Sequence, residues 1–397
     1  MKFWYVCSEC GRTYEIDPQV MTCPHHNQEA NEPLRGLLEV DFDDEVAAKF
    51  RESLDIFDIL PVEREFFPMI PVGNTPLWKP LRLNEFLGFE NVFVKADFLN
   101  PTGSLKDRAS FLVSAFSNKF GIKEIIVAST GNAGSSMAGI GAAAGQKVTL
   151  FIPADAPRAK LIQALQYGAE VVRVDGTYDL AYDLSMKYAE RKKCMSRNTA
   201  YNPMTIEGKK TVAIEIFMQL GKRIPDFVFV PVGDGVILSG VFKGFRDLMK
   251  VGLTDRIPHV VAVQSLGSNA ICEALKTGRF IPKVPRTVAD SIAVGVPRGG
   301  YLAVKKLRHF DGTCVEVSDD EILDAQKILS TTAGVFAEPA AAASLAGFIK
   351  MKSEIPRNTV VVLLITGNGL KDIEAAAKKI RFSNRTIKTL EELLWAE

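Results

Sequence analysis

From about residue 91 onward, short β-branched runs alternate with segments in which apolar residues recur at helical spacing. The runs are short and apolar enough to be buried strands, and they cover residues 91–95, 124–128, 147–152, 170–174, 226–230, 259–263 and 359–365. The helical segments include residues 158–165, 319–329 and 339–350. Continuous apolar strands that alternate with helices are typical of parallel sheets covered on both faces. This alternation predicts an α/β fold.

Length and charge narrow the class of protein. The chain has 397 residues, which is long for a single core and predicts two or three packed units. Lys and Arg number 48 and Asp and Glu number 47, so charge gives no reason to expect a nucleic-acid partner or an acidic membrane. No apolar run approaches the length of a membrane span, and the start lacks an apolar signal core. We therefore expect a cytoplasmic protein without nucleic-acid or membrane partners.

Polar, glycine-rich loops follow three of the expected strands, at residues 129–136, 231–240 and 366–372. In α/β folds a ligand binds beyond the carboxyl ends of the strands. We therefore expect these loops to converge on one edge of a sheet, together with the loop that holds Lys106.

The loop around Gly233 and Gly235 lets the backbone approach an anion closely, because neither residue has a side chain. A helix that starts near Val236 would point its free N–H groups and the positive end of its dipole at that anion. A phosphate group is the natural ligand, although such a loop is often only a tight turn. No Gly-Lys-Ser/Thr follows, so the loop is not a Walker A motif.

Lys106 lies in the run Asn100-Pro-Thr-Gly-Ser-Leu-Lys-Asp-Arg-Ala-Ser110. A lysine in a loop is usually a solvated surface residue, and that alternative stands beside a catalytic one. An amine must lose its proton before it can attack an aldehyde, which requires desolvation or neighbouring cations. Arg108 and a nearby cofactor are candidates for that influence.

The first residues carry a metal-binding pattern. Cys7 and Cys10, then Cys23 and His26, stand as two pairs separated by twelve residues, which is suitable spacing for tetrahedral zinc. His25 is an adjacent competitor, and reduced cysteines without a metal are the alternative. The other three of the six cysteines are scattered, so the pattern favours a local metal site over a disulfide framework. Four protein ligands would make such a site structural. Residues 43–65 predict one or two short helices after this head.

An ordered set of motifs resembles threonine synthase, a family of pyridoxal-phosphate (PLP) enzymes with the tryptophan-synthase-β-like fold. The motifs lie at residues 100–110, 128–132, 207–211, 231–233, 317–327, 337–347 and 366–372. The resemblance implies PLP fold type II, with two three-layer α/β/α domains, mainly parallel sheets and a small zinc-ribbon-like head. The expected division is a head at 1–36, a large PLP-binding domain at 37–110 and 200–397, and a small α/β domain at 111–199. Some threonine synthases carry a fourth cysteine where His26 stands here.

The resemblance also implies roles for single residues. Lys106 would hold the cofactor aldehyde as a Schiff base and act as general base and acid. Asn132 would hydrogen-bond the cofactor's 3′ oxygen, and Thr366 would face its pyridine nitrogen. Ser129 and Thr130 would bind the substrate carboxylate. The cofactor phosphate would lie on the loop formed by Gly233, Asp234, Gly235, Val236 and Ile237.

The chain departs from the family around the substrate. The phosphate loop usually reads Gly-Asn-Gly-Gly-Asn, and Ala133 stands where the family usually has threonine. The stretch before the family's Glu-Gly-Gln-Lys-Thr usually carries an arginine for the phosphate of O-phosphohomoserine, and here that substrate-binding position is Thr205. An upstream Asn-Ser pair falls at Thr199 and Ala200. Losing a bidentate arginine from a phosphate site is not conservative. The candidate replacements are Lys209, Lys210 and Arg298.

We therefore expect a PLP-dependent lyase of amino-acid biosynthesis that acts on a small amino acid. The first hypothesis is the conversion of O-phosphohomoserine and water to threonine and phosphate. The second is another lyase of fold type II, such as a serine or threonine ammonia-lyase or a β-replacement enzyme, acting on a non-phosphorylated amino acid. The third is a non-catalytic binding protein. The resemblance alone implies a homodimer.

Overall fold

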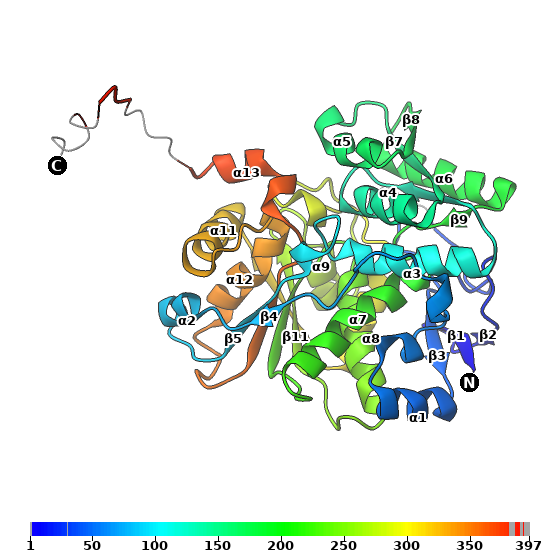
Figure 1. Cartoon of the computed structure of the whole chain (residues 1–397), viewed down its shortest axis with the longest axis horizontal. Helices are drawn as coiled ribbons and strands as arrows, with labels where there is room; N and C mark the ends of the chain where they lie inside the picture. Colours follow the sequence, from blue (N-terminus) through cyan, green and yellow to red (C-terminus); the bar gives the residue numbers. More distant parts are fainter. Residues whose placement is uncertain (1, 30, 381–385, 390–391, 393–397) are drawn as a thin grey trace.

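Three sheets organise the chain in the computed structural model, which describes residues 2–29, 31–380, 386–389 and 392 (Figure 1). The largest sheet has six strands in the order β12-β11-β10-β13-β5-β4. Its strands are β4 (Leu77–Trp78), β5 (Val92–Lys95), β10 (Phe227–Pro231), β11 (His259–Ser265), β12 (Thr313–Val317) and β13 (Val361–Leu364). All neighbouring pairs are parallel except β4 with β5.

Helices cover both faces of this sheet. Because side chains alternate along a strand, Val228 and Val230 pack into one core and Phe229 packs into the other. The first core is closed by α7 (Met204–Gln219), α8 (Val236–Lys250), α9 (Ala270–Thr277) and α10 (Gly300–His309). The second is closed by α2 (Leu81–Leu87), α11 (Asp319–Ala333) and α12 (Pro339–Met351), and the short α13 (Ile373–Ala377) follows near the end of the described chain. Burial on both faces explains why these strands are apolar throughout.

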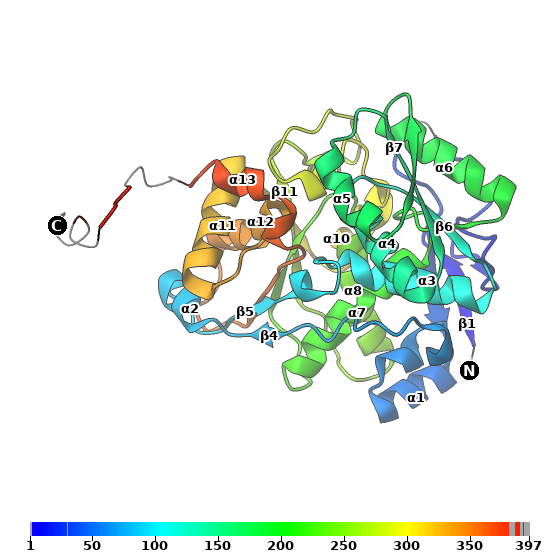
Figure 2. The ribbon, with the colours of Figure 1, turned by 45° about the horizontal axis from the view of Figure 1, so that its top comes forward.

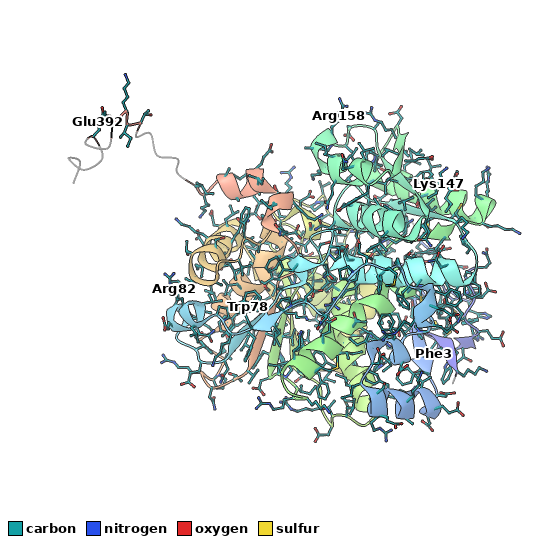
Figure 3. All side chains as sticks on the ribbon, viewed as in Figure 1. Phe3, Trp78, Arg82, Lys147, Arg158 and Glu392 are labelled. Carbon is teal, nitrogen blue, oxygen red and sulfur yellow. A yellow bond between two sulfur atoms is a disulfide. The ribbon has the colours of Figure 1, made fainter. Side chains whose placement is uncertain are left out.

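The second sheet has four parallel strands in the order β8-β7-β6-β9. They are β6 (Glu124–Ala128), β7 (Lys147–Pro153), β8 (Glu170–Val174) and β9 (Met195–Ser196). Figure 2 shows α6 (Tyr178–Lys192) on the opposite side of this sheet from α4 (Asn132–Ala144) and α5 (Arg158–Gln166). The helix α3 (Lys106–Lys119) packs beside α4 and connects this unit to the six-stranded sheet. Lys147 and Arg158 lie at the outer rim of the unit (Figure 3). The α/β class with mainly parallel sheets is confirmed.

The head is a three-stranded antiparallel sheet in the order β2-β1-β3. Its strands are β1 (Phe3–Cys7), β2 (Thr13–Tyr14) and β3 (Leu38–Phe42), so the sheet extends past residue 36. The following segment forms α1 (Asp44–Ser53) and the 3₁₀ turns η1 (Ile56–Ile59) and η2 (Arg64–Phe66). Asp43 caps α1 by accepting a hydrogen bond from the Val46 amide at 2.9 Å.

Each strand expected from a β-branched run is present, with its ends shifted by at most two residues. The strands that the sequence analysis missed are β4, β9 and β12 and the three of the head, most of which are short or only partly buried. The structure also joins two of the scattered cysteines, because Cys272 on α9 and Cys314 on β12 form a disulfide. Within the described residues, no helix is both long and apolar enough to cross a membrane.

Candidate functional site

The carboxyl ends of the two parallel sheets face one cavity of about 570 Å³. Residues 129–133, after β6, line it from one sheet, and residues 233–238, after β10, line it from the other. The loops therefore meet across a space between two sheets, and the expectation of a single sheet edge was wrong. Lys106 and much of the segment 282–298 complete the lining.

Lys106 is the first residue of α3, and the preceding loop is closed around the start of this helix. The carboxylate of Asp107 accepts hydrogen bonds from the Thr102 amide at 2.8 Å and from the Thr102 hydroxyl at 2.5 Å. Gly103 has a φ of +88°, a conformation that favours glycine. These contacts explain the short, polar composition of the run and aim Lys106 into the cavity.

Arg108 anchors α3 through buried ion pairs. Its guanidinium, which is buried, pairs with Asp97 and with Glu215 at 2.6 Å each, and Lys95 pairs with Glu215 at 2.6 Å. Although burial opposes it, the charges of Arg108 and Lys95 lower the pKa of Glu215 to about 2. Arg108 is thus committed to two carboxylates and does not provide the cationic influence on Lys106 that the sequence suggested.

Arg197 provides that influence instead. Burial lowers the pKa of Lys106, and the positive charge of Arg197 lowers it further, whereas Asp234 and Glu338 oppose the shift. Arg197 follows β9, is fully buried and donates from Nε to the Ser110 hydroxyl at 3.1 Å. Burial lowers the pKa of Arg197 to about 10. A lysine in this setting gives up its proton more readily than one in water, as attack on an aldehyde requires.

The loop between β10 and α8 fits a phosphate group. A Cβ atom on Gly233 would lie 2.9 Å from the Ile292 Cα, and one on Gly235 would lie 2.7 Å from the Ala303 Cβ. Gly235 has a φ of +84° and no side chain caps α8, so the N–H groups of its first turn are available to a ligand. The Asp234 carboxylate also lines the cavity and accepts a hydrogen bond from the Arg298 amide at 3.3 Å. The residues present therefore suit PLP, with Lys106 for its aldehyde and this loop for its phosphate.

Asn132, the first residue of α4, lies in the cavity wall with Ser129 and Thr130. Its side-chain amide donates to the Glu338 carboxylate at 2.9 Å and to the Ser291 hydroxyl at 3.0 Å. Burial raises the pKa of Glu338. The sequence analysis assigned no role to Glu338 or Ser291, although Glu338 lies in one of the motifs that carry the resemblance.

Thr366 lies next to the backbone that precedes Lys106. The Leu105 amide donates to the Thr366 carbonyl at 2.8 Å, and the Asn368 amide donates to the Gly103 carbonyl at 3.0 Å. Thr366 itself is buried and is not among the described residues that line the cavity. Its contact with the pyridine nitrogen stays a prediction.

The positions expected to contact the substrate separate into two groups. Thr199 and Lys209 line the cavity. Thr205 does not, because it is fully buried in the first turn of α7 and its hydroxyl donates to the Asn202 carbonyl at 2.7 Å. Ala200 is also buried away from the cavity lining.

The other two candidate phosphate binders already have partners. Lys210 pairs with Asp247 at 3.0 Å, away from the cavity. Arg298 lines the cavity but pairs with Asp179 and stacks 4.8 Å from the Tyr182 ring centroid. Of the three candidates, Lys209 is therefore the one without a carboxylate partner in the part of the chain that the structure describes.

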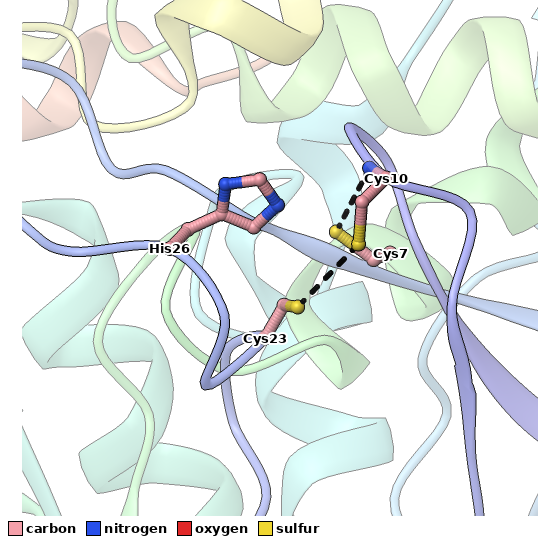
Figure 4. Close-up of side chains that lie close together, drawn as sticks. All are labelled: Cys7, Cys10, Cys23 and His26. Atoms are coloured by element: carbon pink, nitrogen blue, oxygen red, sulfur yellow. Dashed lines mark hydrogen bonds between the residues drawn. The ribbon is translucent and has the colours of Figure 1, made fainter.

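The head brings Cys7, Cys10, Cys23 and His26 together, with their ligand atoms within 4.8 Å of one another (Figure 4). The Cys10 and Cys23 sulfurs are 3.8 Å apart, close to the roughly 3.8 Å edge of a tetrahedron with Zn–S bonds of about 2.3 Å. The Nε2 atom of His26 is buried and has no hydrogen-bond partner among the described residues. His25 is exposed and does not belong to the group. The donor set therefore fits zinc.

Comparison with known proteins agrees with this geometry. Residues 69–367 match the family described as pyridoxal-phosphate dependent enzyme. The threonine synthase of Methanocaldococcus jannaschii is 36% identical over 96% of this chain and 95% of its own length. The threonine synthase of Synechocystis sp. is 36% identical over 87% of this chain and 85% of its own.

Among solved structures, the threonine deaminase of T.th. superposes with a TM-score of 0.65 and 26% identity, covering 78% of this chain and 94% of that one. Maize serine racemase gives a TM-score of 0.67 at 20% identity, over 84% of this chain and 95% of that one, and shows a shared fold. The chain therefore belongs to the pyridoxal-phosphate dependent enzymes, as a lyase similar to the threonine synthases.

Proposed function

We propose that this enzyme converts O-phosphohomoserine and water to threonine and phosphate. The observation that carries the proposal is that Lys106 and the glycine loop before α8 line the same cavity. The relatives named threonine synthase, which align along nearly the whole chain, support the choice of reaction. Bound PLP supplies the electron-accepting ring that stabilises negative charge at the carbon next to the substrate nitrogen.

The chain's own residues position the substrate and move protons. Lys106 Nζ, with a lowered pKa, takes a proton from the substrate and later returns one. Ser129 and Thr130, in the cavity wall, hold the substrate carboxylate. The Glu338 side chain, bonded to Asn132, keeps that amide in one orientation.

Phosphate release from O-phosphohomoserine by the purified holoenzyme tests the proposal. We expect release to depend on Lys106 and to fall by at least roughly 1,000-fold in Lys106→Ala, which removes the general base. A holoenzyme with the normal visible absorption of bound cofactor but no phosphate release would overturn the threonine synthase assignment.

A second candidate function is ammonia release from serine or threonine. Thr205 and Ala133, which replace an arginine and a threonine of the family motifs, favour it, and so does the similarity to a threonine deaminase structure. An assay of keto-acid formation across unphosphorylated amino acids separates the two functions. Turnover of serine or threonine in that assay, without release of phosphate from O-phosphohomoserine, would establish the second.

We further propose that Cys7, Cys10, Cys23 and His26 hold a structural zinc ion. The support is the 3.8 Å spacing of the Cys10 and Cys23 sulfurs and the His26 Nε2 atom, which has no hydrogen-bond partner among the described residues. Glu9, 3.9 Å from His26 Nδ1, would hold the ring in place. Metal analysis should give one zinc per chain, and Cys23→Ser should lose it, whereas His25→Ala should retain it. Equal zinc content in the wild type and Cys23→Ser would exclude these ligands.

A further inference from the structure

Lys209 is a buried lysine without a carboxylate partner among the described residues. Its side chain is fully buried on α7, and no carboxylate in the described part of the chain pairs with it. The hydrogen bond found for its ammonium group is a long one, 3.5 Å to the Thr199 hydroxyl. Burying an unpaired charge is costly, so proteins rarely keep one without a ligand or a function. Lys209 also lines the cavity.

Two more cations lie close by without ion pairs. Neither Lys106 nor Arg197 forms a salt bridge within the described residues, and the Nη1 atom of Arg197 is buried with no hydrogen-bond partner. Burial lowers the pKa of Lys209 well below its usual value, the charges of Lys106 and Arg197 lower it further, and Asp234 opposes them. A dianion in the cavity would relieve this repulsion and restore the charge on Lys209.

The position of Lys209 explains the altered family motif. Thr205 stands where the motif has an arginine, and Lys209 stands where the motif Glu-Gly-Gln-Lys-Thr has glutamine. Residues 205 and 209 are four apart on α7 and therefore lie on the same side of the helix. The positive charge that is missing at Thr205 is present one helical turn further along.

We propose that Lys209, with the Thr199 hydroxyl, binds the phosphate group on the side chain of the substrate. This inference rests on the proposed function and narrows it, because it selects phosphorylated amino acids over serine or threonine. A neutral side chain would leave the ammonium group unpaired, whereas a phosphate dianion accepts a charge-assisted hydrogen bond from it.

The cofactor phosphate is a different ligand, and the loop of residues 233–237 provides for it. That loop follows β10 of the six-stranded sheet, and its donors are backbone N–H groups. The Lys209 ammonium instead reaches Thr199, which follows β9 of the other sheet. The two anions would thus contact different donors within the same cavity.

Titration of the holoenzyme with inorganic phosphate, followed by calorimetry, tests the inference. Lys209→Gln, which restores the family residue, should weaken phosphate binding by roughly 10- to 100-fold, the effect of losing one charge-assisted hydrogen bond. Lys209→Arg should retain most of the affinity. Lys352→Gln, the same change on an exposed lysine, should bind like the wild type. The visible absorption of the cofactor should be the same in all four proteins.

Two results would overturn the inference: equal phosphate affinity in the wild type and Lys209→Gln, or loss of the cofactor from Lys209→Gln, which would assign Lys209 to the cofactor phosphate. If Lys209→Gln does not fold, Thr199→Val tests the same subsite and should weaken phosphate binding several-fold. The titration needs no turnover. A holoenzyme that binds phosphate through Lys209 but leaves O-phosphohomoserine intact would therefore overturn the threonine synthase assignment and retain the subsite.

Discussion

Lys209 and Lys210 are neighbours on α7, and both are fully buried, yet their surroundings are opposite. Lys210 donates to the Asp247 carboxylate at 3.0 Å and to the Ile59 carbonyl at 2.8 Å, and it also pairs with Glu207. Within the described residues, the Lys209 ammonium group has one hydrogen bond, a long one of 3.5 Å to the Thr199 hydroxyl. On the same helix, Lys210 is therefore paired with carboxylates, whereas Lys209 remains able to pair with a ligand.

The difference separates a folding role from a binding role. The Lys210 cluster continues through Lys243, which contacts both Glu207 at 3.1 Å and Asp247 at 2.7 Å. Against the effect of burial, these lysines hold the pKa of Asp247 well below its usual value. The cluster joins α7 to α8, whereas the charge of Lys209 is complete only with a ligand. Replacing both lysines in the same way tests this distinction.

The largest expected effect comes from replacing Lys210, the lysine that is paired with carboxylates. Lys210→Met should lower the free energy of unfolding by about 3 kcal/mol, because it leaves the Glu207 carboxylate without one of its two partners in a buried site. Denaturant unfolding of the holoenzyme, with the midpoint and slope compared with the wild type, measures it. Lys352→Met, on an exposed lysine, serves as the control and should change stability by less than about 0.5 kcal/mol. A similarly small change in Lys210→Met would show that the cluster does not stabilise the fold.

An intermediate effect is expected from the binding of phosphate at Lys209. Inorganic phosphate at 100 times its dissociation constant should stabilise the wild-type holoenzyme by about 2.7 kcal/mol. Lys209→Met should lose most of this stabilisation, since its side chain cannot pair with the anion. Thermal unfolding with and without phosphate gives the comparison, and sodium chloride at equal ionic strength is the control. Equal stabilisation of both proteins would place the phosphate elsewhere.

The sequence alone could not separate these two lysines. Adjacent residues on a helix point about 100° apart, so their surroundings depend on which elements pack on each side. Lys106, Gly233 and Gly235 could be singled out because a local run of residues determines their backbone conformation, and the structure brings them to one cavity. The α/β fold was found for a similar reason, since strand and helix periodicity is local.

Contacts between distant segments were missed. The Glu338 carboxylate accepts a hydrogen bond from the side-chain amide of Asn132, which is 206 residues away in the sequence. No local sequence pattern predicts that pair. Arg197 follows a strand of two residues, too short to be recognised from composition. The Cys272–Cys314 disulfide joins residues 42 apart that share no motif. In the head, by contrast, the short Cys23-x2-His26 spacing was enough to favour the ligand that the structure groups with the cysteines.

The smallest effect concerns the stability of Lys209→Met without phosphate. A lysine whose pKa is lower in the folded protein than its unfolded value of about 10.4 binds fewer protons when folded. The free energy of unfolding then rises with pH between the folded and unfolded pKa values. Below that pH range, Lys209 lowers the stability of the fold. We therefore expect Lys209→Met to match or exceed the wild type near pH 7, and the gap to narrow toward pH 9. Lys106 and Arg197 are present in both proteins, so their own titration cancels from the difference to first order. Unfolding of both proteins in phosphate-free buffer at several pH values measures this difference in stability. If Lys209→Met is destabilised as strongly as Lys210→Met, Lys209 stabilises the fold and is not reserved for a ligand.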